Sequence, residues 1–214
     1  MMTKKLSLFP ALESTTQEIL EIPVSESRKE VLQTLIDYIQ GKIDQGEAVN
    51  LNFICTHNSR RSQFSQIWAQ TAADYFGVPA QCFSGGVEVT AFNDRAVDSI
   101  KRNGFKVSSK GDSNPIYEVS HSENGEPIIA FSKVFDDPVN SADQFAAVMT
   151  CSHADENCPF IPGTEKRIPV RYNDPKEFDD TPQEAEKYDE RSMQIASEMF
   201  YVFSKINTHH NESN

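Results

Sequence analysis

The amino-acid sequence predicts an α/β fold: an open, mostly parallel, four-stranded doubly wound sheet with helices on both faces, plus an N-terminal helical extension and an inserted β-hairpin. From residue 49 onward, short apolar runs alternate with helical segments, as in parallel sheets whose strands are joined by helices. Ligands of such sheets bind beyond the carboxyl ends of the strands. Cys55 and Cys151 directly follow two of the apolar runs and would lie at those ends.

The composition indicates one main globular unit. The chain has 214 residues, of which 38% are hydrophobic and 24% are charged, enough for one α/β domain with a real core. We expect a helical extension over residues 1–47, an α/β domain over 48–207 with an insertion at about 111–145, and a disordered tail over 208–214.

The charge and the cysteine count narrow the possible partners. The formal net charge is −12 and no lysine and arginine cluster spans a face, so we expect no nucleic-acid and no membrane partner. A local cradle of amides and arginines could still hold an anion.

No stretch approaches the ~20 apolar residues that cross a bilayer, and the N-terminus makes a poor signal peptide. Four scattered cysteines do not resemble a secreted disulfide framework, so we expect a cytoplasmic protein.

Two helices are predicted before the first strand. Residues 15–22 suggest a short helix that ends at Pro23. From residue 26 to about 45, leucine and isoleucine recur at helical spacing, which predicts an amphipathic helix with a serine cap and Gly46 at its end.

The next four elements alternate. A strand is expected over 49–54, a helix over 62–76 that Gly77 ends, a strand over 80–84, and a helix over 93–105 that Asn93 caps and Gly104 ends.

The later elements include the insertion. Residues 116–120 and 127–135 flank Asn124-Gly125, a strong hairpin turn, and residues 140–145 suggest a short helix or turn. Residues 146–150 and 167–172 are expected to be strands. A long final helix over 181–206 would have Thr181 as its cap and Pro182 in its first turn.

The most informative segment is Cys-Thr-His-Asn-Ser-Arg-Arg-Ser, residues 55–62, between a strand and a helix. Such a loop can turn its N–H groups inward as an anion nest that the helix N-terminus completes. The amides and Arg61 would favour the thiolate of Cys55, and the planar guanidinium fits two oxygens of a tetrahedral oxyanion. This arrangement suits attack by a thiolate on phosphorus or a similar centre. The candidate oxyanion-binding residues are Thr56, His57, Asn58, Ser59, Arg60, Arg61 and Ser62. The alternative is that the Cys-x5-Arg spacing arose by chance. The position of the segment between a strand and a helix argues against that alternative.

The segment Phe-Ile-Cys-Thr-His-Asn-Ser-Arg-Arg-Ser-Gln resembles the phosphate-binding loop of the low-molecular-weight protein tyrosine phosphatase superfamily, which includes the thioredoxin-coupled arsenate reductases. Residues 83–105, with Gly85-Gly86, resemble the stretch after the second strand of that superfamily. The similarity covers roughly residues 49–110 and 146–206.

A second motif resembles the reductase branch in particular. Residues 150–163 carry Cys151 and Cys158, spaced as in the Cys-x6-Cys redox relay of those reductases. The resemblance implies that Cys151 displaces arsenite from Cys55 and that Cys158 then takes over the disulfide, which a thioredoxin-like reductant reduces. Such exchange would need a flexible polar loop at residues 152–157. A zinc site with His153 and plain packing are the alternatives, and zinc usually requires four ligands.

The resemblance also implies a general acid. The superfamily places an Asp-Pro after the strand that follows the second motif, and Asp174-Pro175 stands there. Asp137-Pro138 is a rival within the insertion, and a surface turn is the plain alternative for Asp174. His57 is interpreted as loop scaffold or substrate rim, and Cys82 as a buried packing residue.

The chain departs from the superfamily pattern at three positions. His57 and Arg60 stand where glycine and often cysteine are usual, and Arg60 would add positive potential beside the anion. Gln66 replaces a glutamate that many reductases use in a potassium site, which argues against potassium. We expect no cofactor and no metal.

Three functions follow from these residues. The first is reduction of arsenate with a thioredoxin-type reductant. The second is hydrolysis of phosphotyrosine or of a small phosphomonoester through a cysteinyl-phosphate. The third is a non-catalytic oxyanion or redox sensor.

Overall fold

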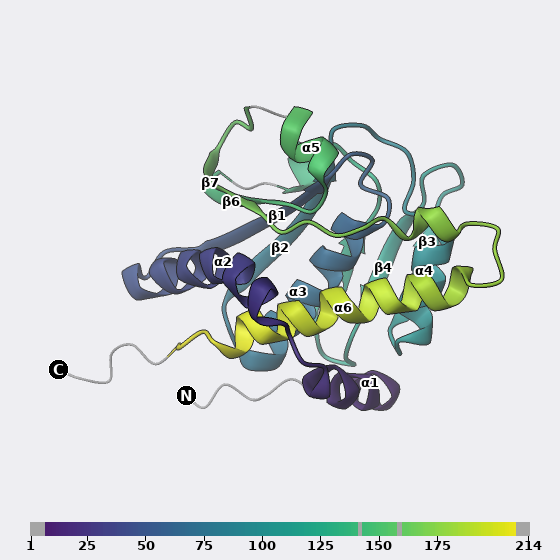
Figure 1. Ribbon diagram of the computed structural model, residues 1–214, viewed down its shortest axis with the longest axis horizontal. Helices are drawn as coiled ribbons and strands as arrows, with labels where there is room; N and C mark the ends of the chain where they lie inside the picture. The colour runs from purple at the N-terminus through teal and green to yellow at the C-terminus, as the bar shows by residue number, and fades with distance from the viewer. Residues whose placement is uncertain (1–6, 141–142, 158–159, 209–214) are drawn as a thin grey trace.

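The computed structural model describes residues 7–140, 143–157 and 160–208 (Figure 1). The tail expected to be disordered therefore lies outside the described residues, except for residue 208. Within the described part, no helix is long and apolar enough to span a membrane.

The central sheet has four parallel strands in the order β2-β1-β6-β7. These strands are β1 (Val49–Cys55), β2 (Ala80–Gly86), β6 (Phe145–Met149) and β7 (Thr164–Pro169). The prediction of an open parallel sheet is confirmed. Strands β1 and β6 lie in the middle, so their carboxyl ends, with Cys55 and the residues that follow Met149, adjoin each other.

Alternating side chains of the sheet enter two separate cores. Ala146 and Val148 belong to a large core, on the face covered by the helices α2 (Glu26–Gln45), α3 (Arg61–Phe76) and α6 (Glu184–Ser204). Ala147 and Met149 belong to a smaller core that contains residues of α5 (Ser152–Asn157). Figure 1 shows α5 on one side of the sheet and α3 and α6 on the other, so helices cover both faces as predicted.

The insertion is larger than the predicted hairpin. The hairpin itself is present as β4 (Ile116–Ser120) and β5 (Ile128–Ala130), which pair antiparallel. A further strand, β3 (Lys106–Lys110), pairs with β4 and makes a three-stranded sheet. Most side chains of β3 are exposed, so its sequence lacks the apolar alternation that would have predicted a strand.

The N-terminal helices pack on the α/β body. Helix α1 (Pro10–Glu21) begins five residues earlier than expected, and α2 has the predicted bounds, with Ser25 as cap and Gly46 in the left-handed conformation. Arg28 of α2 donates two hydrogen bonds to the buried carboxylate of Glu198 in α6. The extension is therefore fixed to the helix layer beside the sheet.

Several boundaries differ from the sequence-based expectation. Strand β7 begins at Thr164 rather than at residue 167, and α4 (Asp94–Arg102) is shorter than predicted. Helix α6 starts at Glu184; the Thr181 hydroxyl donates to the carbonyl of Phe178 and accepts from the N–H of Gln183, in the turn before the helix. The η1 turn (Pro138–Asn140) precedes the expected segment 140–145, of which residues 141–142 lie outside the description.

The expectation of a flexible loop over residues 152–157 is wrong, because these residues form α5. The Cys151 sulfur accepts a hydrogen bond from the N–H of Ala154 at 3.4 Å, the position where a capping group acts. The short segment also rests on the sheet through Ala154, which is fully buried. Asp155 of the same helix also pairs with Arg167 and Arg171, so tertiary contacts order a polar segment that has little helical signal.

Candidate active site

The loop between β1 and α3 is held from the outside by its carbonyl groups. Each carbonyl of residues 56–60 accepts at least one hydrogen bond, at distances of 2.8–3.2 Å. The donors are the N–H groups of Val87 and Glu88, the hydroxyls of Thr90 and Ser132, the side chain of Gln63, and the N–H groups of Asn93 and Phe64. These hydrogen bonds therefore hold the shape of the loop without a bound ligand.

The amides of the same loop are left unpaired. No backbone N–H of residues 56–60 donates a hydrogen bond to another residue within the described part of the chain. Satisfied carbonyls together with unpaired N–H groups are what an anion nest requires. Gly86 approaches this loop so closely that a Cβ there would lie 2.8 Å from the amide nitrogen of Asn58.

Cys55 lies at the start of the nest, at the end of β1, and is 4% exposed. Its sulfur lies 3.0 Å from the hydroxyl oxygen of Ser62. That oxygen accepts a hydrogen bond from the side-chain amide of Asn58 at 2.8 Å, which leaves the Ser62 proton for the sulfur. The Ser62 hydroxyl is therefore placed to donate a hydrogen bond to the Cys55 sulfur.

Asn58 has the backbone conformation that this chain of bonds requires. Its φ is +46°, in the left-handed region that asparagine tolerates better than most residues. The side-chain oxygen accepts from the N–H of Lys133 at 3.1 Å, and the side chain is fully buried. Asn58 thereby connects the insertion, Ser62 and Cys55.

Arg61 and Asp174 lie together beside the loop. The guanidinium contacts the Asp174 carboxylate at 2.7 Å and donates to the carbonyl of Tyr172 at 3.1 Å. The other carboxylate oxygen of Asp174 accepts from the N–H of Lys176, as the cap of the η2 turn (Pro175–Phe178). Asp174 is 28% exposed, so it borders the loop and also reaches solvent.

Asp137 does not share this environment. One of its carboxylate oxygens accepts from the N–H of Val139 in the η1 turn, as expected of turn chemistry. No contact joins Asp137 to residues 55–62 among the described residues.

Cys151 lies next to the loop and belongs to the same small core as Cys55. Its sulfur is 3.5 Å from the hydroxyl of Thr56, and its side chain is 1% exposed. The Thr56 hydroxyl also lies 3.2 Å from the Nδ1 atom of His153. Cys158, the other expected relay residue, lies outside the described residues.

The side chains of three other loop residues point elsewhere. Arg60 donates to the hydroxyl of Tyr188 at 2.7 Å and pairs with Asp179 at 3.4 Å, so its guanidinium anchors the loop to α6. This differs from the expectation that Arg60 adds positive potential beside the anion, because its guanidinium is bonded to Tyr188 and Asp179. His57 is half-exposed, with its Nε2 atom 3.4 Å from Glu88. The Ser59 hydroxyl donates to the carbonyl of Ala91, so His57, Ser59 and Arg60 offer the nest their backbone N–H groups.

The residues that brace the loop from the insertion were not expected from the sequence. The Ser132 hydroxyl donates to the carbonyl of His57, and the N–H of Lys133 bonds Asn58. Gly85 lies against Phe135, where a Cβ would meet the Phe135 Cα at 2.3 Å. The Gly85-Gly86 pair was the one available signal of such close backbone approach.

Cys82 and Gln66 are structural in this arrangement. Cys82 is buried in β2, as expected, and burial raises the pKa of its thiol well above the ordinary value. Gln66 donates to the carbonyl of Ile129 and accepts from the Ser84 hydroxyl. The described residues contain no group of three or more histidine, cysteine or acidic side chains that could hold a metal.

Sequence comparisons identify arsenate reductases as relatives of this chain. The chain is 32% identical over 123 residues to arsenate reductase 2 of Staphylococcus epidermidis, which is 58% of this chain and 76% of that protein. It is 32% identical over 124 residues to the arsenate reductase of Brevibacillus brevis, 58% of this chain and 74% of that protein. It is 29% identical over 133 residues to the arsenate reductase of Bacillus subtilis, 62% and 78% respectively.

Among solved structures, a low-molecular-weight protein tyrosine phosphatase from T. tengcongensis superimposes with a TM-score of 0.51 at 16% identity. The match covers 74% of this chain and 100% of that one. A scan against models of protein families finds no match.

The parallel sheet and its connections give this chain the fold of a low-molecular-weight protein tyrosine phosphatase. The sequence relatives show that the chain belongs to the arsenate reductase family.

Proposed function

We propose that this enzyme reduces arsenate to arsenite, with Cys55 as the nucleophile, Cys151 and Cys158 as a disulfide relay and a thioredoxin-type protein as the final reductant. One observation carries the proposal. The Cys151 sulfur lies against Thr56, the residue next to the nucleophile, and both cysteines are buried in one core. A second thiol in this position is suited to attack the Cys55 sulfur once that sulfur holds an oxyanion.

The first step is attack by the Cys55 thiolate on arsenic. A sulfur–arsenic bond forms and one oxygen leaves as water, after taking a proton. Asp174 is the proposed donor of that proton, because it borders the loop and is held there by Arg61. The unpaired amides of residues 56–60 and the Arg61 guanidinium bind the remaining oxygens.

The second step transfers two electrons to arsenic. The Cys151 thiolate attacks the Cys55 sulfur, a disulfide forms, the sulfur–arsenic bond breaks and arsenite leaves. Cys158 then attacks Cys151, which releases Cys55 and gives a Cys151–Cys158 disulfide. The dithiol of the reductant reduces this disulfide and is itself oxidised. We expect the cycle to run in the cytoplasm, where resting thiols remain reduced.

The relay requires α5 to change shape. Cys151 caps the first turn of α5, and Cys158 follows the last residue of that helix by one position. A helix six residues long is marginal by itself, so the contacts of Ala154 and Asp155 are what its unwinding has to break. Unwinding would free the Cys151 sulfur from the Ala154 N–H and let the two ends of residues 151–158 approach each other.

The second candidate function is hydrolysis of a phosphomonoester. The pairing of Arg61 with Asp174 supports this candidate as well, because an acid in that place could protonate an alkoxide or phenolate leaving group. It gives no role to Cys151, which a hydrolase does not need beside its nucleophile. That difference favours the reductase.

The two candidates are separated by replacing Cys158 with serine in the full chain. The reductase predicts that thioredoxin-dependent release of arsenite over many turnovers is lost in Cys158→Ser and kept in the control Cys82→Ala. Unchanged multiple turnover of arsenate in Cys158→Ser would contradict the relay. Hydrolysis of an aryl phosphate at full rate by wild type and by Cys158→Ser, without arsenite release by either, would favour the phosphatase.

A further inference from the structure

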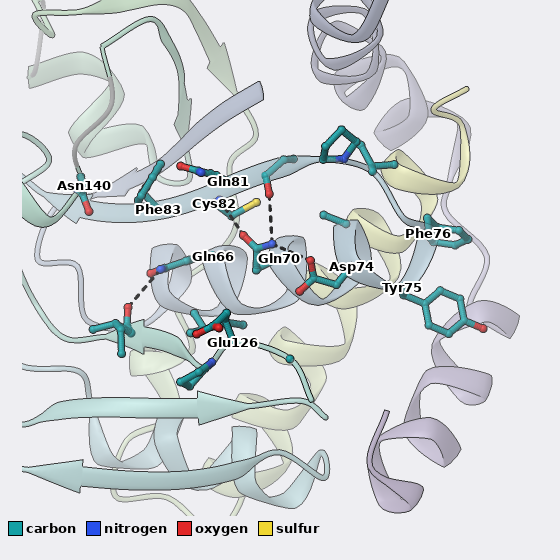
Figure 2. A pocket seen from close by; sticks show the side chains of 18 of the residues that line it. Gln66, Gln70, Asp74, Tyr75, Phe76, Gln81, Cys82, Phe83, Glu126 and Asn140 are labelled. Atoms are coloured by element: carbon teal, nitrogen blue, oxygen red, sulfur yellow. Dashed lines mark hydrogen bonds between the residues drawn. The ribbon is translucent and has the colours of Figure 1, made fainter. Parts of the chain in front are cut away.

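A second cavity lies apart from the oxyanion loop. It has a volume of about 970 Å³ and runs between α3 and β2 on one side and the insertion on the other (Figure 2). None of residues 55–62 lines it. Its size lies within the range of cavities that bind small molecules.

Most polar groups of this cavity are already satisfied. Figure 2 shows Gln70 bonded to Asp74 and to the backbone of β2, where it receives the N–H of Cys82 and donates to the carbonyl of Ala80. Gln66 is bonded to Ile129 and Ser84. The side-chain amides of Gln66 and Gln70 therefore have partners within the protein and do not require a ligand.

Lys133 is the exception. The residue is 2% exposed, and its ammonium group has no hydrogen-bond partner among the residues that the structure describes. The ammonium nitrogen lies 4.7 Å from the centroid of the Phe131 ring. A buried ammonium with three free donors is costly unless a partner is supplied.

A second unsatisfied group lies on the same cavity. The side-chain N–H groups of Asn140 donate to the carbonyls of Ser84 and Phe135, both at 3.1 Å. The Asn140 side-chain oxygen remains buried without a partner in the described part of the chain. The residues that line the cavity thus include a buried charged donor and a buried neutral acceptor, neither with a partner among the described residues, while Phe83 and Ile128 provide apolar walls.

We propose that this cavity binds an organic carboxylate with an apolar body, the carboxylate accepting hydrogen bonds from the ammonium group of Lys133. The region already carries the negative charges of Asp74, Glu126 and the neighbouring Asp137, and Lys133 is the one positive charge among the described residues that line the cavity. A carboxylate with one negative charge is therefore repelled less than a phosphate dianion with two. The apolar body would lie along the aliphatic and aromatic side chains of the cavity. Its far end would reach solvent beside Val139, which is 53% exposed at the rim.

The protonation of Lys133 agrees with this role. Burial lowers the pKa of the Lys133 ammonium to about 8, and the Asp137 carboxylate opposes that change. The group therefore still carries its proton at pH 7. The site shares no lining residue with the oxyanion loop, and Lys133 contacts that loop through its backbone N–H rather than through its ammonium group.

Calorimetric titration of the full chain with decanoate at pH 7 tests the site. We expect saturable binding that weakens tenfold or more in Lys133→Met, since a hydrogen bond to a charged group is lost. Decanol should bind the wild type and Lys133→Met alike, and decanoate should bind the control Lys110→Met as it binds the wild type. Equal decanoate affinity in wild type and Lys133→Met, or no saturable binding by the folded wild type, would overturn the proposal.

Two further measurements keep the outcome decisive. Val139→Glu puts a carboxylate at an exposed rim position, so it should lower the affinity for decanoate without affecting folding. If the affinity of Val139→Glu for decanoate equals that of the wild type, the result counts against the site even if Lys133→Met fails to fold. Excess inorganic phosphate should leave decanoate binding unchanged. Displacement by phosphate would assign decanoate to the oxyanion loop and refute the proposal.

Discussion

The hydroxyl of Thr56 lies 3.5 Å from the sulfur of Cys151, although the two residues are 95 positions apart in the chain. This contact exists because β1 and β6 are parallel neighbours whose carboxyl ends meet. It brings the second cysteine to the first residue after the nucleophile. The proposed relay begins at this contact.

Removing the Thr56 hydroxyl should slow the relay. Thr56→Val keeps the shape of the side chain but loses the group that lies near both the Cys151 sulfur and His153. A lost hydrogen bond of about 1 kcal/mol predicts five- to tenfold slower formation of the Cys55–Cys151 disulfide in single-turnover quench experiments. Thr56→Ser should keep the wild-type rate, and equal rates in Thr56→Val and wild type would show that the contact is not used.

Asp174→Asn should impair the first step. Loss of a general acid typically lowers the rate 10²- to 10⁴-fold, so kcat/KM for arsenate should fall by about 10² or more. Asp137→Asn is the matched control, since Asp137 caps a turn in the insertion, and it should keep the wild-type value. The opposite ranking of the two variants would assign the acid to Asp137.

Gly86→Ala should disturb the oxyanion nest. The added Cβ would lie 2.7 Å from the carbonyl oxygen of Glu88 and 2.8 Å from the Asn58 nitrogen, closer than real Cβ contacts. We expect the free energy of unfolding to fall by about 1–3 kcal/mol and phosphate to protect Cys55 from alkylation less well.

Gly41→Ala is the control for that substitution. Gly41 lies inside α2, and the nearest atom to its added Cβ would be 3.9 Å away. Alanine there should stabilise the chain by about 0.5–1 kcal/mol, as measured by denaturant unfolding, because it restricts the unfolded backbone. A Gly86→Ala protein as stable and as well protected by phosphate as Gly41→Ala would contradict the close approach.

Lys133 should make stability depend on pH in the alkaline range. Burial lowers its pKa from 10.5 to about 8, so between these values the unfolded chain binds more protons than the folded chain. Stability relative to Lys133→Met should therefore rise from pH 8 to 10.5, and the penalty is fully present below pH 8. Lys133→Met should be more stable at pH 7, by about 3 kcal/mol at most, in urea unfolding. A difference that stays constant up to pH 10.5 would show that the lysine is not desolvated.

The sequence predicted the order of elements around Cys55, where consecutive residues decide the structure. The apolar run before Cys55, the polar loop and the helix after Arg61 are consecutive, so their geometry follows from residues close to each other in the chain. The parallel sheet followed from the alternation of elements, and parallel neighbours explain why Cys151 lies near Cys55.

The sequence did not predict what depends on distant contacts. Arg60 belongs to a motif that suggests anion binding, yet Tyr188 and Asp179, more than a hundred positions away, hold its guanidinium. The bracing of the loop by Ser132 and Lys133 also has no local signal, because both residues lie in the irregular segment that follows β5. The exposed strand β3 was missed because Val107 is its only apolar residue, so no apolar alternation marks it.

Disulfide mapping by mass spectrometry after a single turnover with arsenate tests the central claim most directly. In the wild type, the reductase predicts a Cys151–Cys158 disulfide and a free Cys55 thiol. In Cys158→Ser, it predicts a Cys55–Cys151 disulfide with one equivalent of arsenite released. Arsenite formed without either disulfide, or a Cys55 that never forms a bond to Cys151, would contradict the account.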